Sequence, residues 1–341
     1  MENKNFNNEG QEKAEELIED LLKKMKKEKN NKFTFLLVGR TGVGKSSTIN
    51  SLLGKDVAKV NDTRAETMEV TIYPGEDFGI RYDVIDTPGL CDEQEEAGND
   101  AVYINKMIEK VKTFDIMWFV SILGETRVSA DEKRAIRLIS DAFGKDVWQR
   151  AVIILTFSNK EASDTFRKRL DLRTEVIREN IAKYSGAKIA NNIPSVAIDN
   201  KATKNPDGKP WLGELYTTVI ERISDEGALP FLMVTAKRIK VNTNNNLAWE
   251  SSGGYKSHNY FEQNNSSGGG NYSGQNEGSH SSKIEIDESQ ASRINNRINT
   301  GAVLGTAAVG AAIGAMVGGP VGAAIGGLIG GIAGLFGSRR R

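Results

Sequence analysis

Residues 39–46 read GRTGVGKS and directly follow an apolar run at residues 33–38. A strand that leads into a glycine-rich turn and then a helix is the setting of a P-loop, where backbone N–H groups and a helix N-terminus converge on phosphate oxygens. Lys45 is then placed to reach the β- and γ-phosphates, and Ser46 to offer its hydroxyl to Mg²⁺. We expect phosphates to contact Gly39, Arg40, Thr41, Gly42, Val43, Gly44, Lys45, Ser46 and Ser47.

A second motif, DTPG at residues 86–89, ends another apolar run. Its spacing predicts that Asp86 holds Mg²⁺ through water and that the N–H of Gly89 senses the γ-phosphate. Thr67 is the candidate switch threonine that closes over the metal, with Thr63 and Thr71 as alternatives. Downstream of a P-loop, this motif is typical of a GTPase switch.

The base-recognition motif departs from the common pattern. After the apolar run 151–155, an N/T-K-x-D motif would supply an aspartate to the guanine edge, but the chain continues with Thr156, Phe157, Ser158 and Asn159. In a register shifted to begin at Asn159, Ala162 stands where the aspartate belongs. The carboxylate must therefore come from elsewhere in the chain.

Asp199 and Asn200 follow the apolar run 194–198 and are the best-placed candidates. Phe157 would then stack on the purine ring, and Thr156, Phe157, Asp199 and Asn200 would form the base site. The alternative is that Phe157 is a core residue and Asp199 a turn residue.

Four blocks carry a resemblance to a known family: GRTGVGKSSTINSLLG, DTPGL, TRVSADEKRAIRLISDAFGKDVW and AVIILT, in this order. The chain resembles the AIG1-type GTPases over about residues 32–239. This superfamily includes the immune-associated nucleotide-binding proteins and the Toc receptors of the chloroplast outer envelope. The Toc branch is more similar. It carries THAQ where this chain has TFSN at residues 156–159, and a glutamate–asparagine pair where this chain has Asp199 and Asn200.

The resemblance also bears on hydrolysis. Leu90 stands where Ras-like proteins place a glutamine that orients the attacking water, so slow turnover is expected. Arg127 matches the arginine that reaches toward the partner's nucleotide across the Toc receptor dimer. It is expected to stabilise phosphate charge or to hold the dimer together; the alternative is a solvated loop arginine.

Composition excludes several other classes of protein. The 341 residues are 26% charged with a formal net charge of zero, which argues against a nucleic-acid partner. Cys91 is the single cysteine, so no intrachain disulfide is possible. The two histidines, His258 and His280, lie in a low-complexity stretch, which argues against a catalytic triad or a histidine-rich metal site.

The chain divides into five segments. Residues 1–31 predict an amphipathic helix, which docks on the next domain or contacts a partner or membrane surface. Residues 32–240 alternate strand and helix patterns, which predicts an α/β domain with a doubly wound, mainly parallel sheet. Residues 241–284, rich in Asn, Ser and Gly, predict a disordered linker, and residues 285–300 a short polar segment.

Residues 301–341 form a glycine-rich tail whose first 37 residues, 301–337, contain no charged side chain. Glycine at every fourth position favours close packing of membrane helices, so this glycine zipper is expected to form a helical membrane segment. A hairpin, one kinked span and a soluble tail are the alternatives, because Pro320 divides the stretch. Its repeat consists of Gly310, Gly314, Gly318, Gly322, Gly326, Gly330 and Gly334.

These features predict a membrane-tethered GTPase that binds GTP and GDP with Mg²⁺, forms a homodimer or oligomer through its G domain, and faces the cytosol. Lys45 and Arg127 are the predicted catalytic residues, and Ser46, Thr67 and Asp86 the predicted metal site. The alternatives are a GTP-gated membrane-inserting effector and a GTP-loaded scaffold with negligible turnover.

Overall fold

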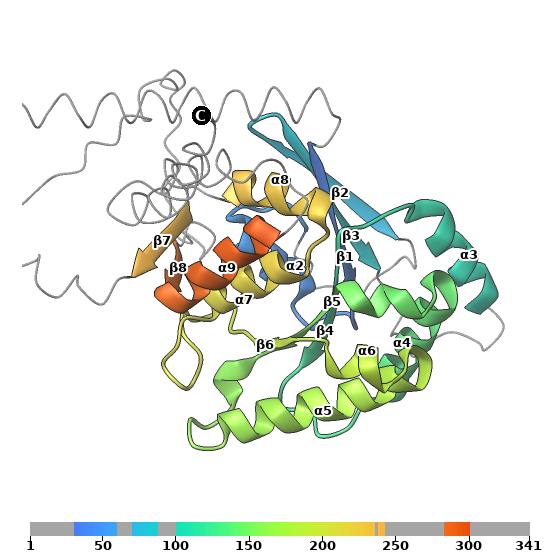
Figure 1. The fold of residues 1–341 in the computed structure, drawn as a ribbon. Helices are drawn as coiled ribbons and strands as arrows, with labels where there is room; N and C mark the ends of the chain where they lie inside the picture. Colours follow the sequence, from blue (N-terminus) through green and yellow to red (C-terminus); the bar gives the residue numbers. More distant parts are fainter. Residues whose placement is uncertain (1–30, 60–69, 88–99, 236–237, 243–282, 301–341) are drawn as a thin grey trace, which may run out of the picture.

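The computed structural model describes residues 31–59, 70–87, 100–235, 238–242 and 283–300 (Figure 1). A central sheet has the strand order β2-β3-β1-β4-β5-β6. β2 is antiparallel to β3 and every other neighbouring pair is parallel, as the sequence predicts. The strands are β1 (Lys32–Val38), β2 (Thr71–Asp77), β3 (Ile80–Thr87), β4 (Ile116–Ile122), β5 (Ala151–Thr156) and β6 (Ser195–Ala197).

Both faces of the central strands β1, β4 and β5 are buried, because strands without polar alternation need cover on each side. In β1, Phe33 and Phe35 point into one hydrophobic cluster, whereas Leu36 and Val38 point into the other. The first face is covered by α2 (Lys45–Leu53), α7 (Trp211–Arg222) and α8 (Asp225–Thr235). The second is covered by α3 (Asp100–Lys110), α4 (Ala130–Phe143), α5 (Phe166–Ser185) and α6 (Ala187–Asn191).

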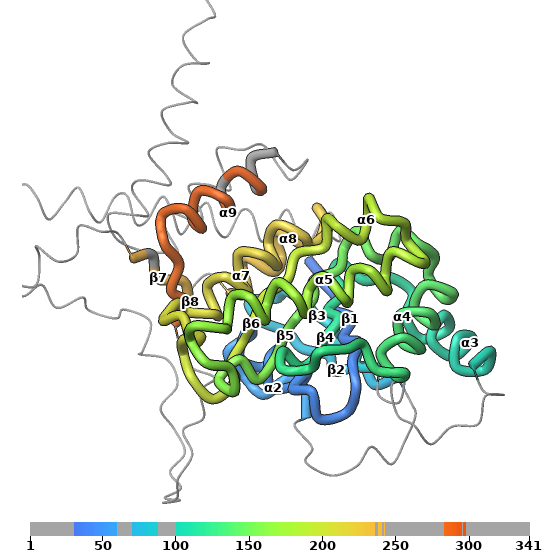
Figure 2. Tube along the Cα trace, turned by 90° about the horizontal axis from the view of Figure 1, so that it is seen from below, coloured from blue at the N-terminus to red at the C-terminus, as the bar shows by residue number. Residues whose placement is uncertain are grey.

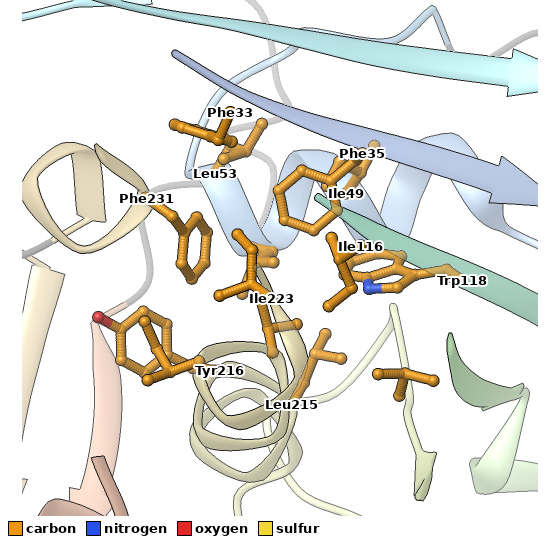
Figure 3. Packing of buried hydrophobic residues seen from close by; sticks show 14 of the residues in the cluster. Phe33, Phe35, Ile49, Leu53, Ile116, Trp118, Leu215, Tyr216, Ile223 and Phe231 are labelled. Carbon is orange, nitrogen blue, oxygen red and sulfur yellow. The ribbon is translucent and has the colours of Figure 1, made fainter. Parts of the chain in front are cut away.

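Aromatic rings hold α8 against β1. Phe231 meets Phe33 and Phe35 edge-on, with ring centroids 5.6 and 5.7 Å apart (Figure 3). Short 3₁₀ helices at Lys145–Arg150 and Ser158–Lys160 flank β5. The first ends where β5 begins, and the second follows its carboxyl end.

The C-terminal described segment differs from the linker and polar segment that the sequence predicts. β7 (Ile239–Asn242) pairs in parallel with β8 (Ile284–Asp287), so both ends of the expected linker are strands. α9 (Glu288–Thr300) then lies along α7 (Figure 2). Buried Ile284, Ile286 and Ile294 join the α7 side of the core. Hydrophobic burial therefore makes this segment part of the α/β domain.

Two predicted elements, the amphipathic helix in residues 1–31 and the glycine-rich tail, lie outside the described residues. Among the helices that the structure does describe, none combines the length and apolar character needed to cross a bilayer.

Candidate nucleotide-binding site

The P-loop connects the end of β1 to the start of α2, as predicted. Gly39 adopts φ 155° and a Cβ there would lie 2.4 Å from the carbonyl oxygen of Val120, so only glycine fits. Gly44, the N-cap of α2, is left-handed with φ 95°. The backbone therefore turns tightly enough to aim the α2 N-terminus at an anion.

Lys45 and Asp86 meet beneath this turn. Lys45 Nζ donates to the carbonyl oxygen of Gly39 at 2.8 Å and lies 3.5 Å from Asp86 Oδ1. That Asp86 oxygen is buried and has no hydrogen-bond partner among the described residues. Burial raises the pKa of Asp86, and the charge of Lys45 opposes this shift.

A buried carboxylate oxygen without a donor fits a magnesium site. Mg²⁺ binds one or two carboxylates and keeps several waters beside substrate phosphates, so it does not need a cage of acidic residues. Among the described residues, no group of three or more His, Cys, Asp or Glu side chains is placed to hold a metal ion. The chemistry of Asp86, with half-buried Ser46 directly after Lys45 in the chain, therefore suits magnesium bound together with phosphates.

The base side of the site lies at the carboxyl ends of β5 and β6. Asn200 Nδ2 donates to Thr48 Oγ1 at 3.0 Å, and Thr48 Oγ1 donates to the Gly44 carbonyl at 2.8 Å. Thr156 is buried and its hydroxyl bonds the Ser121 carbonyl at 3.1 Å. The loop after β6 is thus anchored to the first turn of the P-loop helix.

Phe157 occupies a strained backbone position. It is left-handed, with φ 58°, which costs a bulky residue about 1–2 kcal/mol. Lys160 Nζ lies 4.6 Å from the centroid of the half-buried Phe157 ring. Strain of this kind concentrates where a side chain must be presented to a ligand, which favours the base-stacking interpretation over the core one.

Asp199 is only 2% exposed, and its Oδ1 accepts a hydrogen bond from the Lys201 N–H at 2.9 Å. The Ser158 N–H bonds the carbonyl of neighbouring Ile198 at 3.2 Å, so the Phe157 and Asp199 loops are adjacent. Because this hydrogen bond engages one of the two carboxylate oxygens, a role in the turn is compatible with the guanine-reading interpretation.

The structure describes only some of the remaining predicted site residues. Arg127 is exposed on the loop between β4 and α4. Thr67, Thr63 and Gly89 lie outside the described residues. Thr71, the other candidate switch threonine, is the first residue of β2 and pairs in register with Asp86.

Sequence reasoning missed Thr48 and the ion pair between Arg40 and Glu125. Thr48 could have been found from the sequence, because a hydroxyl one turn into a P-loop helix faces the start of that helix. Glu125 could not, since a glutamate in a loop is ordinarily solvated.

Comparisons with known proteins identify the family of the chain. The AIG1 family profile matches residues 33–209, more than half of the chain. Translocase of chloroplast 34 from Pisum sativum is 32% identical over 224 residues, which cover 59% of this chain and 69% of that protein. Translocase of chloroplast 33 from Arabidopsis thaliana is 28% identical over 224 residues, covering 61% of this chain and 74% of that protein.

A solved structure, Toc33 from Arabidopsis thaliana in complex with GDP and Mg²⁺, is similar at 25% identity and a TM-score of 0.45, covering 65% of this chain and 92% of that one. The family match spans the P-loop, Asp86, Arg127 and Asp199. The family prediction made from four sequence blocks is thereby confirmed: this chain belongs to the AIG1 family of P-loop GTPases.

Proposed function

We propose that this chain is a membrane-tethered GTPase switch that binds GTP with Mg²⁺, dimerises through its nucleotide face and hydrolyses GTP slowly to GDP and phosphate. The observation that carries the proposal is that Lys45 Nζ, at the end of the P-loop, lies 3.5 Å from Asp86 Oδ1, a buried oxygen that accepts no hydrogen bond from the residues that the structure describes. The buried carboxylate of Asp199 lies at the same edge of the sheet. This arrangement supports a site in which phosphate, metal and base are bound side by side.

In this proposal, different residues of the chain bind the phosphates, the metal and the base. The P-loop N–H groups and Lys45 neutralise charge that develops on the transferred phosphoryl group. Ser46, Thr67 and Asp86 would hold the metal, which would supply positive charge to offset the negative charge of the phosphates. Asp199 accepts from the guanine edge, Phe157 stacks on the ring, and Asn200 keeps their loop against α2.

Slow turnover follows from Leu90, which cannot orient the attacking water. Arg127 is exposed, and in this proposal it acts on the nucleotide of a second copy. An arginine supplied in trans stabilises transition-state charge and accelerates related reactions by up to about 10³–10⁵. The slow monomer would then become an active dimer.

Membrane attachment rests on the sequence of residues 301–341, with its charge-free glycine repeat. α9, which packs along α7, ends at Thr300, directly before this stretch of sequence. The G domain would face the cytosol. The full chain should float with liposomes, and a chain ending at Asn299 should remain soluble while retaining nucleotide binding.

Equilibrium binding tests the nucleotide assignment. Asp199→Asn should weaken GTP binding by roughly 2–3 kcal/mol, because a charged hydrogen-bonded acceptor is lost. Asp207→Asn is the matched control, since the Asp207 carboxylate also accepts from the N–H two residues onward, that of Lys209 at 3.2 Å. ATP should displace a fluorescent guanine nucleotide poorly from the wild type. Equal displacement by ATP and GTP would contradict the base site.

A further inference from the structure

Arg173 of α5 has a fully buried side chain, 0% exposed, although arginine is ordinarily a surface residue. Its guanidinium reaches the loop between β4 and α4, residues 123–129. Nη1 donates to the carbonyl oxygen of Arg127 at 2.7 Å, and Nη2 donates to Ser121 Oγ at 2.6 Å. The backbone of the exposed Arg127 is therefore held from beneath by a buried cation.

Two carboxylates flank this cation. Glu132 accepts from Arg173 Nη2 at 2.7 and 2.9 Å through its two oxygens. Glu125 Oε2 lies 3.0 Å from the same nitrogen, and its other oxygen, Oε1, pairs with the guanidinium of Arg40 in the P-loop. Charges thus alternate along one chain of contacts, from Arg40 through Glu125 and Arg173 to Glu132.

Glu132 also fixes the far end of the loop. Its carboxylate accepts from the N–H of Ser129 at 2.9 Å, while the Ser129 hydroxyl accepts from the N–H of Glu132 at 3.2 Å. This reciprocal capping box begins α4. The loop that carries Arg127 is therefore anchored at Glu125, at the Arg127 carbonyl and at Ser129.

Stability alone does not account for the network. A buried ion pair is often no more stabilising than apolar residues of the same volume, because desolvation offsets the attraction. The charged groups do fix geometry, because a planar guanidinium holds its hydrogen-bonded partners in set directions within its plane. Through Glu125, the network connects the P-loop residue Arg40 to Arg173, which in turn holds the backbone carbonyl of the exposed Arg127.

We infer that Glu125 and Arg173 are positioning residues that hold Arg127 in a set place relative to the P-loop, so that it is presented to the nucleotide of a second copy of this chain. The inference rests on the proposed function, in which Arg127 acts in trans. Glu125 links the P-loop to the dimer face, and Arg173 supports the loop between them. Neither residue touches the substrate.

Glu125→Gln tests the inference with little risk to folding, because Glu125 is partly exposed and glutamine has the same shape. Asp141→Asn is the matched control, since it removes a carboxylate that pairs with Arg137 on the surface of α4 at 3.6 Å. For each protein, GTP turnover is measured against protein concentration, with nucleotide affinity measured at a concentration where the protein is monomeric. Hydrogen exchange of residues 123–129 reports the order of the loop directly.

Glu125→Gln should leave monomer nucleotide affinity within about twofold, lower dimer-stimulated turnover by about tenfold, and accelerate exchange of the loop amides. Asp141→Asn should behave as wild type. In an Arg127→Ala background, Glu125→Gln should have no further effect on turnover, because both changes remove the same contribution.

The outcomes separate the two levels of argument. If wild-type turnover does not rise with protein concentration, the proposed function fails and the positioning role falls with it. If wild-type turnover does rise but Glu125→Gln matches it, or lowers turnover equally when Arg127 is already alanine, the dimer proposal stands and the positioning role is wrong.

Discussion

Asn200 donates a hydrogen bond from Nδ2 to Thr48 Oγ1, 3.0 Å away, and thereby joins the loop after β6 to the first turn of the P-loop helix. The two residues are 152 positions apart in sequence. Because Thr48 also bonds the carbonyl of Gly44, the phosphate and base sides of the site share one rigid connection.

Asn200→Ala should therefore affect both stability and binding. Loss of one largely buried hydrogen bond lowers the free energy of unfolding by about 1 kcal/mol, and a loosened Asp199 loop should raise the GTP dissociation constant by roughly tenfold. Asn192→Ala is the control, because the exposed Asn192 side chain bonds the Lys188 carbonyl within its own helix end, away from the loop after β6. Urea unfolding and calorimetric titration measure the two effects. Equal GTP affinity in both variants would show that the connection does not order the site.

Phe157 allows strain and ligand contact to be separated. Glycine at this left-handed position relieves strain, whereas alanine keeps it, so Phe157→Gly should be more stable than Phe157→Ala by about 1 kcal/mol. Both should bind guanine nucleotide more weakly than Phe157→His, which keeps a flat ring. Thermal unfolding and nucleotide titration of the three variants provide the measurements. If all three bind alike, the ring does not stack on the base.

The C-terminal segment should be needed for stability. A chain ending at Asn242 loses the buried side chains of Ile284, Ile286 and Ile294, each of which contributes about 1.5–3 kcal/mol. Its free energy of unfolding should therefore fall by roughly 4.5–9 kcal/mol relative to a chain ending at Asn299.

A protease site inserted within residues 243–282 supplies the control, because cleavage leaves every residue present. After cleavage, the fragment containing β8 and α9 should co-elute with the rest, held by the core and by Arg293, which lies 2.6 Å from Glu221. Release of that fragment at micromolar concentration would contradict the packing of α9 on α7.

Asp115 gives stability a defined pH dependence. Burial raises its pKa, and the hydrogen bonds from Ser224 and the Thr34 N–H oppose the shift only in part. A carboxyl whose folded pKa exceeds its unfolded value stabilises the fold below the unfolded pKa of about 4, and this contribution is lost as the pH rises through the folded value. Asp115→Asn should therefore gain stability relative to wild type between about pH 4 and pH 7. Urea unfolding at several pH values checks this, and a pH-independent difference would contradict it.

Sequence reasoning predicted the parts of the molecule that local patterns determine. The P-loop follows from its glycines, and the parallel sheet follows from apolar runs that alternate with helical ones. Asp199 and Asn200 were predicted as base-site residues because the residues after β5 lack the expected aspartate. All of these signals lie within short windows of the chain.

The remainder depends on contacts that short windows do not contain. β7 and β8 are four-residue strands separated by a low-complexity stretch, so nothing local indicates that they pair. Arg173 lies in a highly charged helix, where an arginine is normally solvated, and only the folded structure brings Glu125 and Glu132 to it.

The rate of GTP hydrolysis per molecule, measured over a wide range of protein concentration, tests the central claim most directly. A chain ending at Asn299 should show a low rate when dilute and a rate that rises to a plateau as dimers form, with Mg²⁺ required throughout. Arg127→Ala should remain at the low rate, and Lys45→Ala should bind GTP weakly at every concentration. A wild-type rate that is independent of concentration, and unchanged by Arg127→Ala, would contradict the account of a GTPase that acts as a dimer through its nucleotide face.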